Sequence, residues 1–288
     1  MRKILPFLLL FLSININAQA PQKLSASEIY EKIEKLNFLG SVLYLAAHPD
    51  DENTRLISYF SNQKHARTAY LSLTRGDGGQ NLIGPEIREQ LGLIRTQELL
   101  AARRIDGGQQ FFSRANDFGY SKNPDETLKT WNKDEVLSDV VWVIRNFKPD
   151  VIINRFDHRT PGTTHGHHTS SAILSVEAFD ITKDKSIYPD QLKYTSTWQP
   201  ERMFFNTSSW FFSNQQAFRE ATKDEKYLTF DTGVYFPLKG LSNPEIASLS
   251  RSQHQSQGFG STGSRGSEME YLELIKGSQP ASREDVFS

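Results

Sequence analysis

The sequence predicts an α/β fold of three layers, with a Rossmann-like, mostly parallel sheet covered by helices on both faces. Two observations lead to this prediction. Strand-like apolar segments alternate with helical segments between residues 41 and 178, and three polar clusters begin where an apolar segment stops. Such alternation is typical of parallel sheets that bury both faces. At 288 residues, the chain is long enough for one large domain of this kind, predicted over residues 21–288.

The apolar run over residues 41–47 has the composition of a strand buried on both faces. Further strands are predicted over residues 66–73, 109–113 and 150–154, and helices over 25–36, 53–61, 86–105, 133–146 and 165–178. From about Ser196 onward the sequence is aromatic and irregular. Residues 250–266 are rich in Ser, Gly and Gln, which favours a flexible loop.

The N-terminus has the pattern of a secretory signal over residues 1–20. Met1-Arg2-Lys3 precedes a short apolar run, and Ala18-Gln19-Ala20 resembles a cleavage site. Pro6 and the brevity of the run argue against the alternative of a membrane anchor. We therefore expect export to the periplasm or the exterior, and a mature chain without a stable membrane span. Residues 277–288 contain no clear helix stop or strand closure, which favours a longer natural polypeptide with further domains.

The charge balance narrows the class of partner. The chain has 33 basic and 34 acidic residues, interspersed, for a formal net charge of −1. This distribution excludes a basic stripe for nucleic acid and favours a small-molecule or glycan substrate. Cysteine is absent, so any metal site must use His, Asp or Glu side chains.

Two of the polar clusters contain side chains that bind metals. Residues 48–52 (HPDDE) follow the first predicted strand, and residues 165–168 (HGHH) open a predicted helix. Because residues three apart share a helix face, His165 and His168 are predicted to face one site and His167 to point elsewhere. Taken alone, the first cluster is more often a helix cap and the second more often a surface segment than a metal site. Together, at the carboxyl ends of parallel strands, they predict a catalytic metal site.

Three segments resemble the motifs of one enzyme family: AHPDDE over residues 47–52, TRGDGGQN over 74–81 and THGHH over 164–168. They are similar to motifs of the LmbE-like, or PIG-L, family of zinc-dependent N-acetylglucosaminyl deacetylases. The resemblance covers residues 42–178, and weaker similarity to an exported branch extends through residues 252–258.

This resemblance implies roles for five residues. His48, Asp51 and His168 are implied as Zn²⁺ ligands, and Asp50 as the general base. His165 is implied to stabilise the oxyanion or to protonate the leaving amine. Many relatives have Pro-Asp where this chain has Gly166-His167. Asp157 is therefore suggested as a substitute partner for His165.

Substrate contacts are expected from Arg75, Asp77 and His254. Two alternatives stay open: Arg75 pairs with Asp77 to hold the turn, and His254 is a solvated loop residue. We predict a structural ion pair between Arg95 and Glu98, which lie three apart on one helix. The aromatic cluster over residues 210–212 either stacks on a sugar ring or belongs to the core.

The function predicted from these features is a zinc-dependent hydrolase that removes an N-acyl group, most simply N-acetyl, from an amino sugar or glycoconjugate. One alternative is a zinc amidase that acts on a non-sugar conjugate. The other is a non-catalytic glycan-binding module on the same fold. Retention of Asp50 argues against the second alternative, because a binding module has no need of a general base.

Overall fold

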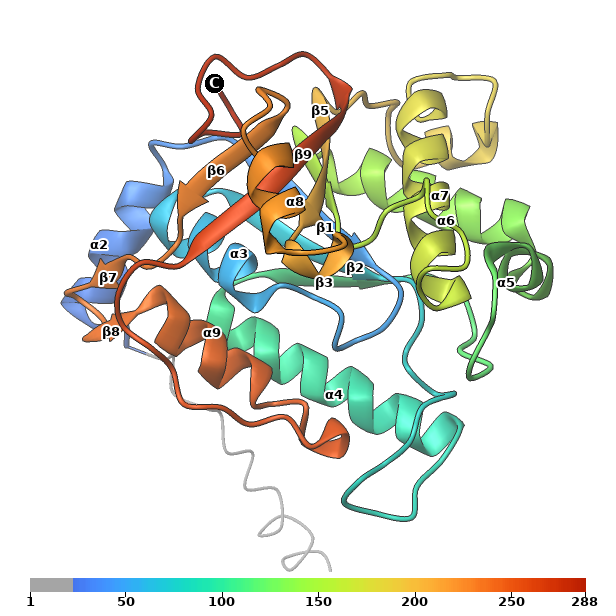
Figure 1. Ribbon diagram of the computed structural model, residues 1–288, viewed down its shortest axis with the longest axis horizontal. Coiled ribbons are helices and arrows are strands. Elements are labelled where there is room, and N and C mark those ends of the chain that lie inside the picture. The colour runs from blue at the N-terminus through green and yellow to red at the C-terminus, as the bar shows by residue number, and fades with distance from the viewer. Residues whose placement is uncertain (1–22) are drawn as a thin grey trace, which may run out of the picture.

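A seven-stranded sheet forms the centre of the protein (Figure 1). The computed structural model describes residues 23–288, so the predicted signal over residues 1–20 lies outside the described part. The strand order is β3-β2-β1-β4-β5-β9-β6. The strands are β1 (Ser41–Ala46), β2 (Arg67–Ser72), β3 (Gln109–Phe112), β4 (Val151–Asn154), β5 (Arg202–Thr207), β6 (Tyr227–Asp231) and β9 (Met269–Gly277). Strands β1 to β5 pair in parallel and β9 pairs antiparallel to β5 and β6, which confirms a mostly parallel sheet.

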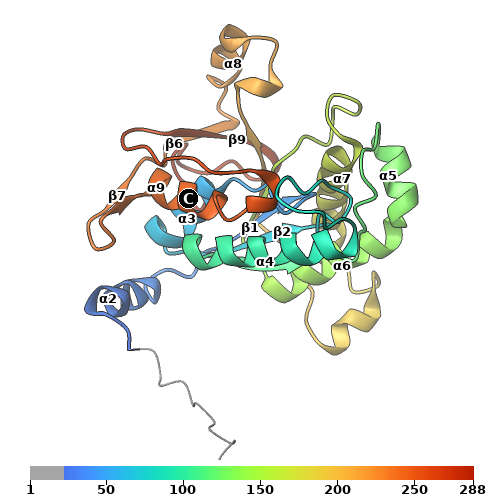
Figure 2. The same ribbon diagram turned by 90° about the horizontal axis from the view of Figure 1, so that it is seen from below.

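Helices cover both faces of this sheet. The α-helices of the described residues are α2 (Ala26–Lys35), α3 (Thr54–Ser58), α4 (Glu89–Asp106), α5 (Pro124–Trp131), α6 (Lys133–Phe147), α7 (Gly166–Ile181), α8 (Gln215–Ala221) and α9 (Asn243–Arg251), of which α2 and α8 project from the body in Figure 2. Alternate residues of β1 point to opposite faces. Tyr44 packs in one core cluster with Leu99 of α4, and Leu45 packs in a second cluster with Val140 of α6. The predicted three-layer α/β fold is therefore confirmed.

The order of the strands places a crevice beside β1. The chain runs outward from β1 through β2 to β3, and then returns to the other side of β1 at β4. Loops that leave the carboxyl ends of such neighbouring strands diverge, and ligands bind between them. The two metal-binding clusters predicted from the sequence follow β1 and β4, so both border this crevice.

The last third of the chain is more regular than the sequence suggested. It supplies β5, β6 and β9 as well as helix α8, which stands away from the body in Figure 2, and α9, which lies beside α4 in Figure 1. A two-stranded hairpin joins β7 (Tyr235–Phe236) to β8 (Leu241–Ser242). Within the part of the chain that the structure describes, no helix is both long and apolar enough to cross a bilayer.

The loop predicted over residues 250–266 is wrong for part of residues 250–257, whereas residues 258–266 form no helix or strand. Residues Ser250 and Arg251 end α9, and Gln255–Gln257 form a 3-10 turn. Glu98 of α4 accepts hydrogen bonds from the backbone N–H and the hydroxyl of Ser256, at 2.7 and 2.6 Å. A polar composition gave no sign of these contacts, because their partner is remote in the sequence.

Candidate metal centre and active site

The turn after β1 is held by its own side chains. Asp51 Oδ2 accepts a hydrogen bond from the backbone N–H of His48 at 2.7 Å. Asn53 caps α3 by accepting from the N–H groups of Arg55 and Leu56, at 3.1 and 3.2 Å. Capping groups of this kind fix where a helix begins. The turn therefore presents His48 and Asp51 in a defined arrangement at the end of β1.

The second cluster is fixed by the start of α7. His165 is the N-cap residue, with φ −52° and ψ 140°, and its Nδ1 accepts a hydrogen bond from the N–H of His167 at 3.1 Å. His168 lies in the first turn of α7, and its ring stacks on Phe156 with centroids 3.8 Å apart and an interplanar angle of 4°. Both imidazole rings are thus oriented by local contacts.

Three donor groups converge between these segments. His48 Nδ1 lies 3.1 Å from Asp51 Oδ2, and His168 Nε2 lies 3.5 Å from Asp51 Oδ1. The candidate ligand atoms of His48, Asp51 and His168 all lie within 4.8 Å of one another. Two imidazoles and one carboxylate form a donor set that suits Zn²⁺ and leaves a coordination position open. The residues present therefore fit a divalent metal.

The protonation states of His168 and Asp51 suit metal binding, whereas the pKa of His48 is shifted the other way. Burial lowers the pKa of His168 to about 4, so its ring is neutral at pH 7, the form that binds metals. For Asp51, burial opposes ionisation, but the neighbouring His168 and His48 outweigh it and lower the pKa of the carboxyl group. For His48, burial opposes the charged ring, but attraction to Asp51 outweighs it and raises the pKa.

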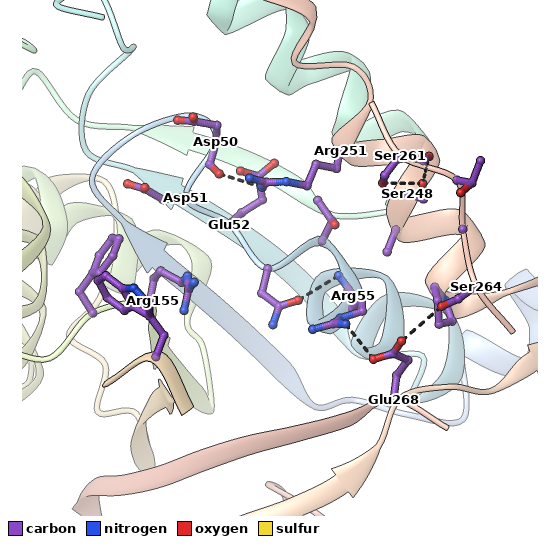
Figure 3. A pocket seen from close by; sticks show the side chains of 18 of the residues that line it. Asp50, Asp51, Glu52, Arg55, Arg155, Ser248, Arg251, Ser261, Ser264 and Glu268 are labelled. Carbon is purple, nitrogen blue, oxygen red and sulfur yellow. Dashed lines mark hydrogen bonds and ion pairs between the residues drawn. The ribbon is translucent and has the colours of Figure 1, made fainter. Parts of the chain in front are cut away.

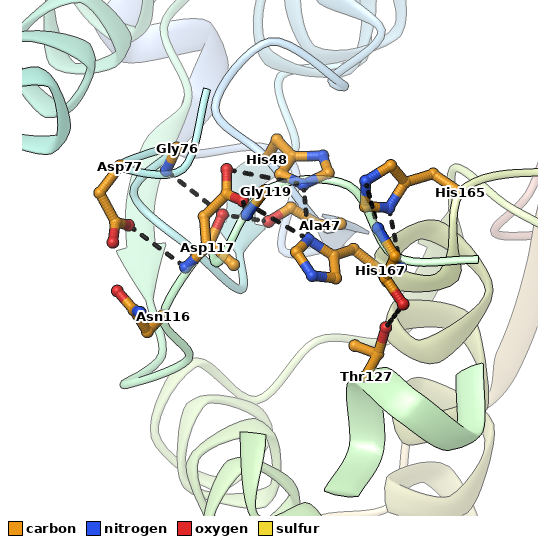
Figure 4. Close-up of polar contacts among 12 residues, drawn as sticks. Ala47, His48, Gly76, Asp77, Asn116, Asp117, Gly119, Thr127, His165 and His167 are labelled. Carbon is orange, nitrogen blue, oxygen red and sulfur yellow. Dashed lines mark hydrogen bonds and ion pairs between the residues drawn. The ribbon is translucent and has the colours of Figure 1, made fainter. Parts of the chain in front are cut away.

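His167 does not point away from the site, which corrects the sequence prediction. Its Nδ1 lies 3.0 Å from His48 Nε2, as Figure 4 shows. The prediction failed because His165 is extended and the helix begins only at Gly166, so helical spacing does not apply across this segment. Burial lowers the pKa of His167 to about 2, and a neutral ring accepts the Nε2–H of His48. The lone pair of His48 is then on Nδ1, on the side of Asp51.

Asp117 joins the same network and was missed in the sequence. Its Oδ1 lies 3.7 Å from His167 Nδ1, and its Oδ2 lies 3.9 Å from His48 Nε2. It belongs to the polar segment after β3, at the same edge of the sheet as the other two clusters. Its position after a parallel strand was the one signal that could have identified it.

Asp50 is oriented by Arg95 of α4. Arg95 Nη2 donates to Asp50 Oδ1 at 2.5 Å, and Arg95 Nη1 donates to the carbonyl of Gly76 at 3.1 Å. The predicted Arg95–Glu98 ion pair is therefore wrong, since Arg95 reaches across to the turn after β1. The second oxygen, Asp50 Oδ2, has no hydrogen-bond partner among residues 23–288. A side chain at residue 76 would collide with the Arg95 guanidinium, and Gly76 has φ +70°, so glycine is required there.

Both ring nitrogens of His165 face backbone N–H groups. The capping bond at Nδ1 needs a lone pair on that atom, and a neutral imidazole has only one such nitrogen. The N–H of Ser121 points at Nε2, at 3.3 Å, so the two backbone N–H groups compete for the one lone pair of a neutral ring. Burial, with repulsion from His48, lowers the pKa of His165. The ring is therefore a neutral hydrogen-bond donor.

Asp157 is not a partner of His165, which corrects a second expectation. It binds Arg159 instead, at 2.8 Å from Nε to Oδ1. Arg159 also donates to both oxygens of Glu273 on β9, at 2.9 and 2.6 Å. These bonds attach the loop that carries His165 to the sheet.

The Glu273 cluster leads to a prediction about acid stability. Burial of Glu273 opposes ionisation, but bonds from Arg159 and Lys226 outweigh it and lower its pKa below the ordinary 4.5. The stability it contributes is therefore present above the pKa of the unfolded chain and is lost as the pH falls through the lower folded-state pKa. We expect Glu273→Gln to lower the free energy of unfolding by about 1 to 3 kcal/mol at pH 7, with a shallower loss than the wild type below about pH 4.5.

Urea unfolding between pH 3 and pH 7 measures this effect. The exposed Glu284 makes no ion pair within residues 23–288, so Glu284→Gln is the matched control and should follow the wild type. Parallel pH profiles for Glu273→Gln and the wild type would refute the assignment.

A cavity of about 690 Å³ is lined by two of the donor residues, Asp51 and His168. Figure 3 shows Asp50 and Asp51 at this cavity. Asp50, Asp51 and His168 line one end of it, and residues of α9 and the segment 261–264 line the other. Trp210 also lines it, with 67% of its surface exposed, so this residue is not part of the core. The cavity can therefore hold a molecule larger than an acyl group alone.

Arg75 and Asp77 lie apart from this cavity. The Arg75 guanidinium lies 4.2 Å over the ring of Phe112, and no ion pair joins it to Asp77 within the described residues. Asp77 lines a second cavity of about 470 Å³ together with Asp117. Substrate contact by these two residues stays a prediction.

His254 is fully buried and donates to Glu52 Oε1 at 2.8 Å. Arg103 donates to the same oxygen at 3.2 Å. This burial is inconsistent with both a solvated loop position and direct contact with a sugar. His254 instead joins the segment after α9 to the turn that carries Asp50 and Asp51.

One known protein family matches the segment that contains these donor groups. The family model described as PIG-L, GlcNAc-PI de-N-acetylase, matches residues 43–179. No curated protein matches the chain significantly.

Two solved structures share the fold. One is the N,N'-diacetylchitobiose deacetylase from Pyrococcus horikoshii in complex with its inhibitor MPG, with 16% identity, a TM-score of 0.52, and coverage of 83% of this chain and 82% of that one. The other is GalB, the 4-carboxy-2-hydroxymuconate hydratase from Pseudomonas putida KT2440, with 14% identity, a TM-score of 0.52, and coverage of 84% and 97%. The family match covers both donor clusters, so residues 43–179 of this chain are similar to the PIG-L, or LmbE-like, family of de-N-acetylases.

Proposed function

We propose that the protein is a zinc-dependent hydrolase that removes an N-acyl group, most simply N-acetyl, from an amino sugar or glycoconjugate. The observation that carries the proposal is the convergence of His48, Asp51 and His168 next to Asp50, at one end of the large cavity. When bound there, zinc supplies Lewis acidity toward the acyl carbonyl and toward water. The family and the sugar deacetylase of the same fold support an N-acyl substrate.

The chain's own residues supply the proton transfers. Arg95 holds Oδ1 of Asp50, so Oδ2 is available to take a proton from the attacking water. The oxygen of that water forms a bond to the acyl carbon, and Asp50 passes the proton to the departing nitrogen as the C–N bond breaks. A ring N–H of His165 donates toward the carbonyl oxygen while negative charge develops on it. The products are a carboxylic acid and an amine, and transfer of the acid proton to the amine gives a carboxylate and an ammonium group.

Acetate release from a panel of N-acetylated sugars tests this proposal. The metal-depleted protein should release no acetate, and one equivalent of zinc per chain should restore the activity. Release only from non-sugar amides would favour the zinc amidase, and tight sugar binding without any release would favour the glycan-binding module. One neighbour of the same fold is named a hydratase, so addition of water to a C=C bond without acetate release would also overturn the proposal.

We also propose that residues 1–20 direct export and are then removed. The positive N-terminus, the short apolar run and Ala18-Gln19-Ala20 support this. N-terminal sequencing of protein recovered outside the cytoplasm should begin near Gln19 or Pro21. Mature protein that retains Met1 would contradict it.

A further inference from the structure

Most carboxylates that line the large cavity already have partners. Asp50 is paired with Arg95 at 2.5 Å, and Glu268 is paired with Arg55 at 3.0 Å. Glu52 binds Arg103 and His254, and Asp51 lies between His48 and His168. Each of these carboxylates therefore has a basic side chain or an imidazole beside it, and Arg55 and Arg103 are each shared with a second carboxylate, Glu270 and Asp106 respectively.

Two arginines of the same cavity have no such partner. Within residues 23–288, no carboxylate lies within 4 Å of the guanidinium of Arg155 or of Arg251. Arg251, at the end of α9, donates to the backbone carbonyl of Asp50 at 2.9 Å and stacks on Phe259. Arg155 follows β4 directly and makes no side-chain hydrogen bond to any described residue. Among the described residues, the guanidinium groups of Arg155 and Arg251 thus lack a carboxylate partner.

Arg155 is held close to the donor groups by its surroundings. Its backbone N–H donates to the carbonyl of Leu45 on β1 at 3.0 Å. Its guanidinium lies 5.7 Å from the ring centre of Phe156, which stacks on His168, and 5.9 Å from that of Phe211. In Figure 3, Arg155 approaches the cavity on the side of Asp51. A partly buried cation between aromatic rings loses hydration, and an anion from the ligand can compensate for this loss.

We infer that the substrate is an anionic N-acyl amino sugar whose carboxylate or phosphate binds Arg155 in the large cavity, an inference that rests on the proposed function. Arginine binds both anions with paired N–H donors, so the guanidinium fixes the orientation of the substrate as well as its charge. Trp210 lines the same cavity and is largely exposed, so its ring is available to pack against the sugar. The acyl group would then point toward His48, Asp51 and His168.

Matched substrates test the inference. We would measure acetate release from N-acetylglucosamine, its 6-phosphate and N-acetylmuramic acid, which differ in charge and share the N-acetyl group. The wild type should prefer at least one anionic sugar over the neutral one by about 10- to 100-fold in kcat/KM, as expected for charge-assisted hydrogen bonds. Comparison of the 6-phosphate with N-acetylmuramic acid shows whether the site prefers a phosphate or a carboxylate.

Variants of Arg155 then test whether this residue causes the preference for anionic sugars. Arg155→Gln should lower the ratio of anionic to neutral kcat/KM by about 10-fold or more, chiefly through KM, and Arg155→Lys should restore part of it. Arg219→Gln, which removes an exposed arginine on α8, is the matched control and should keep the wild-type ratio. An equal ratio in Arg155→Gln and the wild type, or a wild-type preference for the neutral sugar, would overturn the inference.

Calorimetric measurement of sugar binding to the same variants distinguishes a failure of the anion site from a failure of the proposed hydrolysis. If no sugar yields acetate but the anionic sugars bind in an Arg155-dependent way, the anion site stands and the proposed hydrolysis fails. If all three sugars yield acetate equally and Arg155→Gln does not change this, hydrolysis stands and the anion site fails.

Discussion

We expect Asp50→Asn to lower kcat by about 100- to 10,000-fold with little change in KM, because the variant loses the proton acceptor and keeps the ground-state contacts. Asparagine has the same shape as aspartate, and its Oδ1 can still accept the hydrogen bond from Arg95. Fold and zinc content should therefore be unchanged. Steady-state kinetics of acetate release, together with elemental analysis of the purified variant, measure both quantities.

Asp139→Asn is the matched control for this experiment. Asp139 pairs with Arg114 on the surface, so the same chemical change there should leave kcat unaffected. Asp50→Asn with near-normal turnover and zinc bound would show that another residue activates the water. Loss of zinc from Asp50→Asn as complete as from His48→Ala would show instead that Asp50 is a ligand.

The second large effect is expected for His168→Ala, which should lose most of its zinc and its activity together. Only His48 and Asp51 would remain, and two protein ligands hold zinc poorly. Removing the ring also exposes the face of Phe156 on which it stacks, so thermal stability should be measured in parallel. Elemental analysis and acetate release at saturating zinc measure the outcome.

His158→Ala is the control for loss of an imidazole that lies outside the donor set. His158 is half-buried in the loop after β4, and its ring lies 3.7 Å from Asp157. We expect it to keep its zinc. Full zinc occupancy in His168→Ala would remove this residue from the ligand set.

The parallel strands could be predicted because the sequence pattern that identifies each of them lies within the strand and the turn that follows it. The residues of β1 are buried on both faces, so the strand is a continuous apolar run with a polar turn at its end. Strands β5 and β9 lack such a pattern. Glu273 is buried in β9 only because Arg159 and Lys226 reach it, and Arg202 is buried in β5 because its guanidinium binds the carbonyls of Ser278 and Val286. A charged residue in a strand is compensated by remote partners, which no local pattern contains.

The same distinction applies to the site. His48, Asp50, Asp51, His165 and His168 were predicted from two short motifs, and the structure brings them together at the carboxyl ends of β1 and β4. The contact of His167 with His48 depends on where α7 begins, and the contact of Arg95 with Asp50 depends on how α4 crosses the turn. Both require the tertiary structure. The prediction for His254 failed for a related reason, because its partner Glu52 is 202 residues away.

Anomalous diffraction at the zinc absorption edge, from crystals of the wild-type protein with zinc, tests the central claim most directly. The account predicts one strong peak, at about 2.0 to 2.2 Å from His48 Nδ1, an Asp51 oxygen and His168 Nε2. The ring nitrogens of His48, His165 and His167 also lie within 4.8 Å of one another and offer a second group of donors. A peak at that second group, or no peak at saturating zinc, would contradict the account.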